Sequence, residues 1–346
     1  MKRIVGGVSL ALVVLTLATL IPGQAQKAGE PEGPKVTTQP AQAEPDTQMQ
    51  PPILDAGARL NPLKIALLKW YLFEDTTSFT VGSQPYGVCF DGANIWTANF
   101  GDDTVTKVQA NTGQVLGTFK VGAQPYGVTF DGGNIWVSNQ VDGTLTKLRA
   151  SDGKVLGTFP VGRFPGWLAF DGQNIWAPNG PDNTVSKLRA IDGKNLGTFA
   201  VGTSPIAVAF DGSAVWVTNY LASTVTKLRA SDGTVLGTFA VGYGALGIAF
   251  DGANMWIANR NSNTVTKLSA SDGTVLGTFT APPSDGPYGV AFDGTYIWVS
   301  GDSYLFVLRV SDGAQVASHR LQSEGIAFDG AYIWTALQSG NRLYKF

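Results

Sequence analysis

The chain has 346 residues, of which 43 are glycine and one is cysteine; 14% are charged, and the formal net charge is −2. This balance excludes a broad basic surface for nucleic acid, and a single cysteine excludes an internal disulfide. Abundant glycine and many aromatic residues, with few charges, are typical of a β-rich globular protein.

Residues 1–25 have the features of an export signal. Lys2 and Arg3 precede an apolar run, and Gly23-Gln24-Ala25 offers small residues for cleavage after Ala25. We therefore expect a secreted or periplasmic (cell-envelope) protein that has no membrane span after cleavage. The apolar run is long for a signal, so an uncleaved membrane anchor is the alternative.

Two short segments separate this signal from the repeats. Residues 26–60 are rich in Pro, Gln, Ala and Glu, which predicts a disordered linker. Residues 61–75 are expected to form a short helix, because Asn61-Pro62 is a favourable helix start. We expect its apolar face to pack on the domain that follows.

The rest of the chain is built from seven repeats. Each contains Phe-Asp-Gly followed by Trp four residues after the Gly, at intervals of 40, 40, 40, 40, 42 and 36 residues. The phenylalanines are Phe90, Phe130, Phe170, Phe210, Phe250, Phe292 and Phe328, and the tryptophans are Trp96, Trp136, Trp176, Trp216, Trp256, Trp298 and Trp334. Repeats of this length with frequent Asp-Gly turns indicate propeller blades.

The second repeat illustrates the expected blade. Strands are predicted at 126–130, 135–138, 144–149 and 155–159, and Asp-Gly dipeptides mark tight hairpins between them. Four antiparallel strands per repeat predict an all-β, seven-bladed propeller over residues 76–346. The recurring Phe and Trp side chains are expected to pack between blades.

The last repeat is too short to form a complete blade. After Trp334 the sequence holds only one further strand, within 341–346, whereas residues 77–82 resemble the outer strand at 237–242. The N-terminal strand is therefore expected to complete the last blade and close the ring.

The repeats resemble a known group. Ile135-Trp-Val-Ser-Asn139, the following Thr-Leu-Thr-Lys-Leu and the Val-Gly-x-x-Pro-Tyr-Gly-Val stretch look like the bacterial YVTN repeat and the related NHL repeat. The resemblance covers residues 76–346. It implies a propeller, and members of this broad group include secreted surface proteins, streptogramin lyases and gluconolactonase-like hydrolases.

Positions that differ between repeats are the candidates for function. Two loop sets vary: those between second and third strands and those between blades, and both are expected on one face around the channel. Aromatic and Arg residues there are typical of binding surfaces. The candidate ligand- or partner-binding residues are Tyr86, Phe100, Tyr126, Arg163, Phe164, Trp167, Tyr220, Tyr243, Arg260 and Tyr288.

The sequence offers little for catalysis, and we predict no catalytic or metal-binding residues. His319 is the single histidine, so a histidine-based metal cluster and the histidine chemistry of streptogramin lyases have no counterpart. By resemblance, gluconolactonase-like enzymes use an inward Glu with Asn and Asp on a divalent cation, and Glu324 is the acid of that kind here. The one cofactor alternative is a calcium site, built from Asp102, Asp103, Asp142, Asp182 and Asn carbonyls.

The leading hypothesis is a secreted, non-enzymatic, monomeric propeller that binds a protein or carbohydrate ligand through its variable loop face. One alternative is a metal-assisted lyase or lactonase-like hydrolase with its site at the channel mouth. The other is a structural component of the envelope or surface layer.

Overall fold

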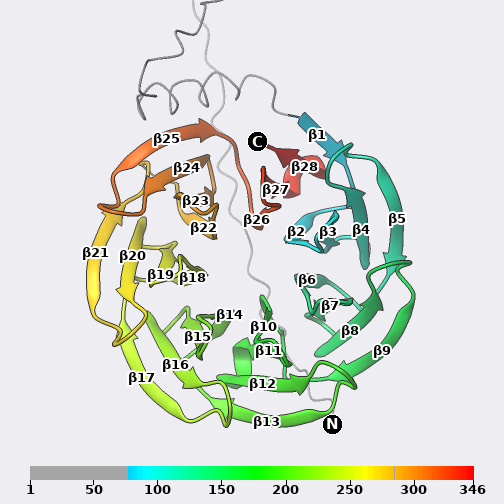
Figure 1. Cartoon of the computed structure of the whole chain (residues 1–346), viewed down its shortest axis with the longest axis horizontal. Helices are drawn as coiled ribbons and strands as arrows, with labels where there is room; N and C mark the ends of the chain where they lie inside the picture. The colour runs from blue at the N-terminus through cyan, green and yellow to red at the C-terminus, as the bar shows by residue number, and fades with distance from the viewer. Residues whose placement is uncertain (1–76, 284) are drawn as a thin grey trace, which may run out of the picture. The chain divides into compact units, whose positions relative to one another are not determined.

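The computed structural model describes residues 77–283 and 285–346. The expectations for residues 1–25, 26–60 and 61–75 lie outside this range. Within it, seven four-stranded antiparallel sheets are arranged around a central axis (Figure 1). The prediction of a seven-bladed propeller is confirmed.

Each blade is given from its innermost to its outermost strand. Blade 1 is β2 (Pro85–Phe90), β3 (Asn94–Asn99), β4 (Thr104–Gln109) and β5 (Val115–Lys120). Blade 2 is β6 (Pro125–Phe130), β7 (Asn134–Asn139), β8 (Thr144–Arg149) and β9 (Val155–Pro160). Blade 3 is β10 (Ala169–Phe170), β11 (Asn174–Asn179), β12 (Thr184–Arg189) and β13 (Asn195–Ala200), with the 3-10 turn η2 (Gly180–Asp182) before β12.

The remaining blades follow the same order. Blade 4 is β14 (Pro205–Phe210), β15 (Ala214–Asn219), β16 (Thr224–Arg229) and β17 (Val235–Ala240). Blade 5 is β18 (Ala245–Phe250), β19 (Asn254–Asn259), β20 (Thr264–Ser269) and β21 (Val275–Thr280). Blade 6 is β22 (Pro287–Phe292), β23 (Tyr296–Gly301), β24 (Tyr304–Arg309) and β25 (Gln315–Arg320). Blade 7 is β26 (Ile326–Phe328), β27 (Ile333–Leu337), β28 (Arg342–Lys345) and β1 (Thr77–Thr80), with the 3-10 turn η3 (Gln338–Gly340) before β28.

The recurring Asp of each Phe-Asp-Gly turn joins the turn to the core. In blade 1, Asp91 Oδ1 accepts hydrogen bonds from the backbone N–H groups of Ala93 and Asn94, and Oδ2 accepts one from Trp96 Nε1 at 2.7 Å. The indole bond recurs in all seven blades. The Asp therefore satisfies the one polar group of an otherwise buried Trp, which explains why both residues recur together.

A lysine on the third strand links most blades to the next. Lys107 Nζ lies 5.3 Å from the centroid of the Trp96 ring and donates to the backbone oxygen of Ala150 in blade 2 at 2.7 Å. The equivalent bonds come from Lys147, Lys187, Lys227, Lys267 and Lys345. Four of these lysines are buried, Lys227 and Lys345 are partly exposed, and none forms an ion pair among the described residues. The carbonyl and the indole face together compensate for the lost hydration.

A phenylalanine on the fourth strand adds a second link. Phe119 packs on Trp96 with ring centroids 5.6 Å apart, and its ring also covers Gly153 in the turn of the next blade. Gly153 has φ +73°, and a Cβ there would collide with the Phe119 ring. Both the backbone conformation and the close packing therefore require glycine.

The N-terminal strand closes the ring as predicted. β1 pairs antiparallel with β28, with Thr77 opposite Lys345 and Thr80 opposite Arg342. Phe79 of β1 stacks on Trp334 at 5.4 Å and covers Gly113 of blade 1, as Phe119 does between blades 1 and 2. The two ends of the repeat region are thus held in one sheet, near each other in Figure 1.

Blade 6 departs from the pattern at two positions. Val307 stands where other blades have the lysine, and His319 stands where they have the phenylalanine. In the other blades both residues contact the turn between the third and fourth strands of the next blade. In blade 7 these two strands are β28 and β1, which no such turn joins. The His319 ring packs on that of Phe346, with centroids 5.9 Å apart. His319 thus lies on β25 in a packing position.

Within the described residues, no helix has the length and apolar character needed to cross a membrane.

Candidate functional site

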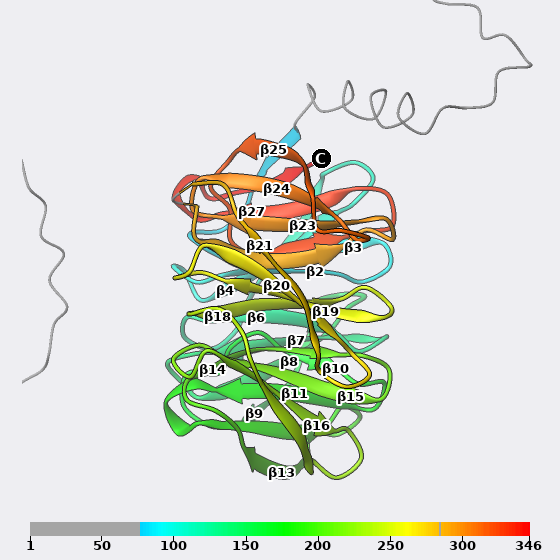
Figure 2. The ribbon, with the colours of Figure 1, turned by 90° about the vertical axis from the view of Figure 1, so that its left-hand side faces the viewer.

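The two variable loop sets lie together on one face of the ring. The loop before β2 and the loop after β3 are joined by backbone hydrogen bonds from Phe100 N to Gln84 O and from Gly101 N to Ser83 O, both 3.0 Å. Blades 2, 4 and 5 repeat this connection. The Asp-Gly turns pair with the turns after the third strands, as in the bond from Ala110 N to Ala93 O. Figure 2 shows the strand connections gathered at these two faces.

The central channel is narrow because the inner strands approach one another at small residues. A Cβ on Gly87 would collide with the backbone oxygen of Tyr126 in the next blade, and Gly325 meets that of Tyr86 in the same way. The equivalent positions in blades 2, 4, 5 and 6 are Gly127, Ala207, Gly247 and Gly289. The channel has a volume of about 140 Å³ and an aliphatic lining that includes Val88, Val128, Leu168, Val208, Ile248, Val290 and Ile326. Aliphatic side chains, the ring of Trp167 and the backbone of the inner-strand glycines therefore surround this hollow.

In six blades one residue directly precedes this small residue, and in blade 3 Gly166 precedes Trp167 at the same position. These positions form a ring, which we call the mouth ring: Tyr86, Tyr126, Gly166, Ile206, Leu246, Tyr288 and Glu324. Tyr86 and Tyr126 pack with centroids 4.9 Å apart, and the hydroxyls of Tyr126 and Tyr288 lie 3.0 Å apart. Burial raises the pKa of Tyr126 and that of Tyr288, so both hydroxyls stay protonated at neutral pH.

Trp167 covers the mouth ring from blade 3. It occupies the position that is Gly or Ala in the other six blades, and β10 is correspondingly shortened to Ala169–Phe170. Its ring stacks on Tyr126 at 5.6 Å and meets Tyr288 edge-on at 5.5 Å. One side chain therefore joins blades 2, 3 and 6 across the axis, and it remains partly exposed.

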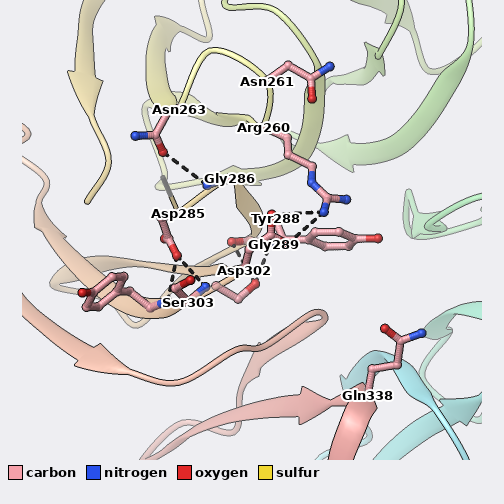
Figure 3. Close-up of polar contacts among 12 residues, drawn as sticks. Arg260, Asn261, Asn263, Asp285, Gly286, Tyr288, Gly289, Asp302, Ser303 and Gln338 are labelled. Atoms are coloured by element: carbon pink, nitrogen blue, oxygen red, sulfur yellow. Dashed lines mark hydrogen bonds and ion pairs between the residues drawn. The ribbon is translucent and has the colours of Figure 1, made fainter. Parts of the chain in front are cut away.

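Arg260 brings a positive charge to the edge of this cluster. It follows β19, and its Nη2 donates to Asp302 Oδ1 at 2.8 Å and Oδ2 at 3.1 Å, which joins blades 5 and 6 (Figure 3). The guanidinium also lies 5.0 Å from the centroid of the Tyr288 ring. The ion pair is about one-third exposed, so it is reachable from solvent on this face.

Glu324 is the acid of the mouth ring and is 5% exposed. Burial raises the pKa of Glu324 to about 7, while the charge of Arg260 lowers it and that of Asp302 raises it. A side-chain hydrogen bond with Tyr288 favours its charged form, yet Oε2 has no hydrogen-bond partner among the described residues. A buried carboxylate with one unsatisfied oxygen is unusual and marks a candidate functional group.

The structure gathers six of the ten sequence-predicted residues. Tyr86, Tyr126, Trp167 and Tyr288 form the aromatic cluster, Phe100 packs on Tyr86 with centroids 5.3 Å apart, and Arg260 lies on Tyr288. Tyr126 and Tyr288 are buried, so they shape the cluster more than they present a surface.

The other four predicted residues lie in the outer loops of the same face. Phe164 and Tyr243 are about half exposed, and Arg163 pairs with Asp182 at 2.6 Å. The Tyr220 hydroxyl donates to Asn261 Oδ1 at 3.1 Å. These side chains are available for contact but do not join the central cluster.

The loop carboxylates considered for calcium are engaged in local hydrogen bonds. Asp102 Oδ2 accepts from Ser83 N at 2.9 Å, and Asp142 Oδ2 accepts from Ala123 N at 2.7 Å. Asp103 and Asp182 similarly bind the N–H groups of Gln124 and Arg163. Among residues 77–283 and 285–346, no three His, Cys, Asp or Glu side chains are grouped to hold a metal.

The recurring Asn at the end of the second strand is a buried structural residue. Asn139 Nδ2 donates to Thr144 and Thr146, and its Oδ1 accepts from Gly122 N in the loop that enters the same blade from blade 1. In blade 6 this position is Gly301. The buried Asp285 lies against Gly301 instead and accepts from the backbone of Ser303 and Tyr304.

Two site residues were missed in the sequence. Gln338 of η3 donates from Nε2 to the Tyr86 hydroxyl at 2.9 Å, and Asp302 holds Arg260. Gln338 lies in the shortened last repeat, where no alignment with other repeats indicated it. Asp302 could have been found, because it follows the Gly301 that interrupts the recurring Asn.

A second hollow lies on the opposite face. It has a volume of about 760 Å³ and is lined by residues that include Asp131, Lys147, Lys187, Ile191 and Leu196. The Asp and Lys positions are the recurring structural ones, and Ile191 is the unusual residue, since Ser occupies its place in blades 2, 4 and 5.

No protein-family model matches the chain, and no curated protein matches it. Several solved structures are similar. A streptogramin B lyase superposes with TM-score 0.67 and 18% identity over 78% of this chain and 96% of that one. A hydrazine synthase of Kuenenia stuttgartiensis gives TM-score 0.68 and 16% identity over 78% and 96%. A catalytically inactive virginiamycin B lyase from Staphylococcus aureus with quinupristin gives 0.66 and 18% over 78% and 98%. At these identities the likeness establishes the propeller fold alone.

Proposed function

We propose that this protein is an exported, non-catalytic propeller that binds a ligand or partner through its variable loop face. The observation that carries the proposal is the cluster of Tyr86, Tyr126, Trp167 and Tyr288. These aromatic side chains converge from four blades at positions that differ between repeats. Residues that are the same in every repeat pack the propeller core in this protein. Aromatic residues gathered at the positions that differ between repeats therefore favour a role in ligand binding.

Two features of the sequence support the rest of the proposal. The basic and apolar start of the chain supports export to the periplasm or the cell exterior. The resemblance of the repeats to YVTN and NHL propellers supports a scaffold whose loops carry the specificity. A protein segment or a carbohydrate is the ligand class that stacks well on partly exposed aromatic rings.

A metal-assisted lyase or hydrolase is less well supported. Glu324 could act as an acid or base near neutral pH. The loop carboxylates, however, are already bonded to backbone, and His319 packs in blade 6, away from the mouth ring. The same face can serve a binding protein without any of these groups.

The proposal is tested with a panel of oligosaccharides and short peptides presented to the purified protein. Hits are titrated against a loop-face variant, Phe164→Ser with Tyr243→Ser, and against the opposite-face variant Ile191→Ser. All three side chains are at least half exposed, so neither variant should unfold. We expect the loop-face variant to bind more weakly and the control to bind normally; the reverse pattern would place the binding surface on the other face.

A further inference from the structure

The mouth ring contains one acid among aromatic and aliphatic residues. Glu324 precedes Gly325 as Tyr86 precedes Gly87, and its neighbours in the ring are Tyr288 on one side and Tyr86 on the other. Its backbone is fixed by bonds from Glu324 N to Ala336 O and from Gly325 N to Tyr86 O. The backbone of Glu324 is therefore held in a defined place beside the aromatic cluster.

The nearby positive charge does not neutralise this carboxylate. Arg260 Nη2 is engaged by both oxygens of Asp302, and Arg260 forms no ion pair with Glu324 within the described part of the chain. Arg260 and Asp302 balance each other, so Glu324 has no ion-pair partner of its own among the described residues once it ionises. Its Oε2 is buried without a partner, which is costly unless a bound group supplies the missing donor.

The aromatic rings around Glu324 suit a cation. The electron-rich faces of Tyr and Trp attract ammonium groups, and the attraction grows when water is excluded. Tyr288 already has a guanidinium over one face, which shows that this cluster accommodates a positive charge. Tyr86 and the partly exposed Trp167 are the other rings available near the mouth.

We infer that Glu324, with Tyr86, Tyr288 and Trp167, forms a recognition site for an organic ammonium group. The inference rests on the proposed binding function and specifies the chemistry of the ligand. The ammonium would donate to Oε2 of Glu324, and the rings would surround its carbon substituents. The same chemistry is offered by a small amine and by a lysine side chain of a partner.

The test compares charged and neutral probes by calorimetric titration of the whole protein. Benzylammonium represents a small amine, Nα-acetyl-lysine amide represents a lysine side chain, and benzyl alcohol is the uncharged control. We expect benzylammonium to bind and benzyl alcohol to bind at least about tenfold more weakly, the factor that a charged hydrogen bond provides. Stronger binding of the lysine probe would indicate a protein partner, and stronger binding of benzylammonium a small amine.

Variants assign the effect to Glu324. Glu324→Gln should lower the benzylammonium affinity about tenfold, whereas the exposed Asp152→Asn should leave it unchanged. The wild-type protein provides a test that needs no folded variant. Its affinity should rise from pH 6 to pH 8 as Glu324 ionises, because an alkylammonium stays charged over that range.

The outcomes separate this inference from the proposed function. Equal binding of benzylammonium and benzyl alcohol, with a flat pH dependence, would overturn the ammonium site and leave an aromatic binding face. Absence of binding by both ammonium probes at millimolar concentration would also overturn it. The oligosaccharide and peptide panel tests the proposed function independently of either result.

Discussion

Trp167 and Tyr288 meet edge-on across the channel mouth, with ring centroids 5.5 Å apart and ring planes at 72°. They come from blades 3 and 6, which are not adjacent in the ring. The contact exists because Trp167 occupies a position that is Gly or Ala in the six other blades. In those blades the small residue lets the inner strand pack closely against the neighbouring inner strand.

Replacing Trp167 should therefore affect recognition more than stability. Trp167→Ala restores the kind of residue that blade 4 has at Ala207, and we expect a loss of about 1 kcal/mol for the aromatic contacts. Urea unfolding measures this loss. Trp216→Ala is the contrasting variant: Trp216 is fully buried, and its removal should cost about 3–5 kcal/mol. Similar losses for both variants would mean that Trp167 is an ordinary core residue.

The ring closure depends on Phe79 as well as on the strand pairing of β1. Phe79 is the fourth-strand phenylalanine of blade 7, and Phe79→Ala should destabilise the protein by about 3 kcal/mol. Deletion of residues 76–82 should be more damaging, because it exposes the edge of β28 and favours aggregation. Thermal unfolding and light scattering report both effects. An unchanged melting temperature after the deletion would show that β1 is not needed for closure.

The turn aspartates should make stability sensitive to acid. Burial alone would raise the pKa of Asp251, but hydrogen bonds from Trp256, Ala253 and Asn254 lower it below the usual value. A lowered folded-state pKa gives stability that is present above about pH 4 and is lost as the pH falls through the folded pKa. Asp251→Asn should cost about 1–3 kcal/mol at neutral pH and weaken the acid dependence. A variant as acid-sensitive as the wild type would contradict this role.

Glu324 should make the folded protein less stable as the pH rises, which is the opposite of the effect of the turn aspartates. Its folded-state pKa is raised to about 7, so the folded protein resists its ionisation. The unliganded protein should therefore lose stability as the pH rises from about 4.5 to above 7, by an amount on the order of 2 kcal/mol. Glu324→Gln should abolish this loss and be the more stable protein at pH 8. Denaturant titrations at pH 5 and pH 8 measure the difference, and parallel changes in both proteins would refute it.

The sequence predicted the scaffold well because the scaffold repeats. The blade strands, the closure by residues 77–80 and the grouping of the two loop sets all follow from alignment of one repeat with another. The Asp-Gly dipeptides were expected to form hairpin turns, whereas the hydrogen bond between each Asp and the Trp indole was not expected. The interval of five residues between Asp91 and Trp96 recurs in every blade. This constant spacing could have indicated that the two side chains interact.

The candidate site was harder to predict because its residues lie at positions that differ from one repeat to the next. The convergence of Trp167 on Tyr288 depends on a local change in blade 3, where β10 is shortened, and on the diameter of the closed ring. Glu324 was noted as an inward acid, but its place in the mouth ring required the alignment of Glu324-Gly325 with Tyr86-Gly87. The contact of Gln338 with Tyr86 joins residues 252 apart in sequence, which only the closed ring brings together.

Amide hydrogen exchange, with and without a ligand from the oligosaccharide and peptide panel, can locate the binding surface without any substitution. We expect slower exchange in the loops around residues 83–86, 163–167 and 260–263, with little change at the Asp-Gly turns. Slower exchange confined to the Asp-Gly turns or to the outer strands would contradict the claim that the variable loop face is the binding surface.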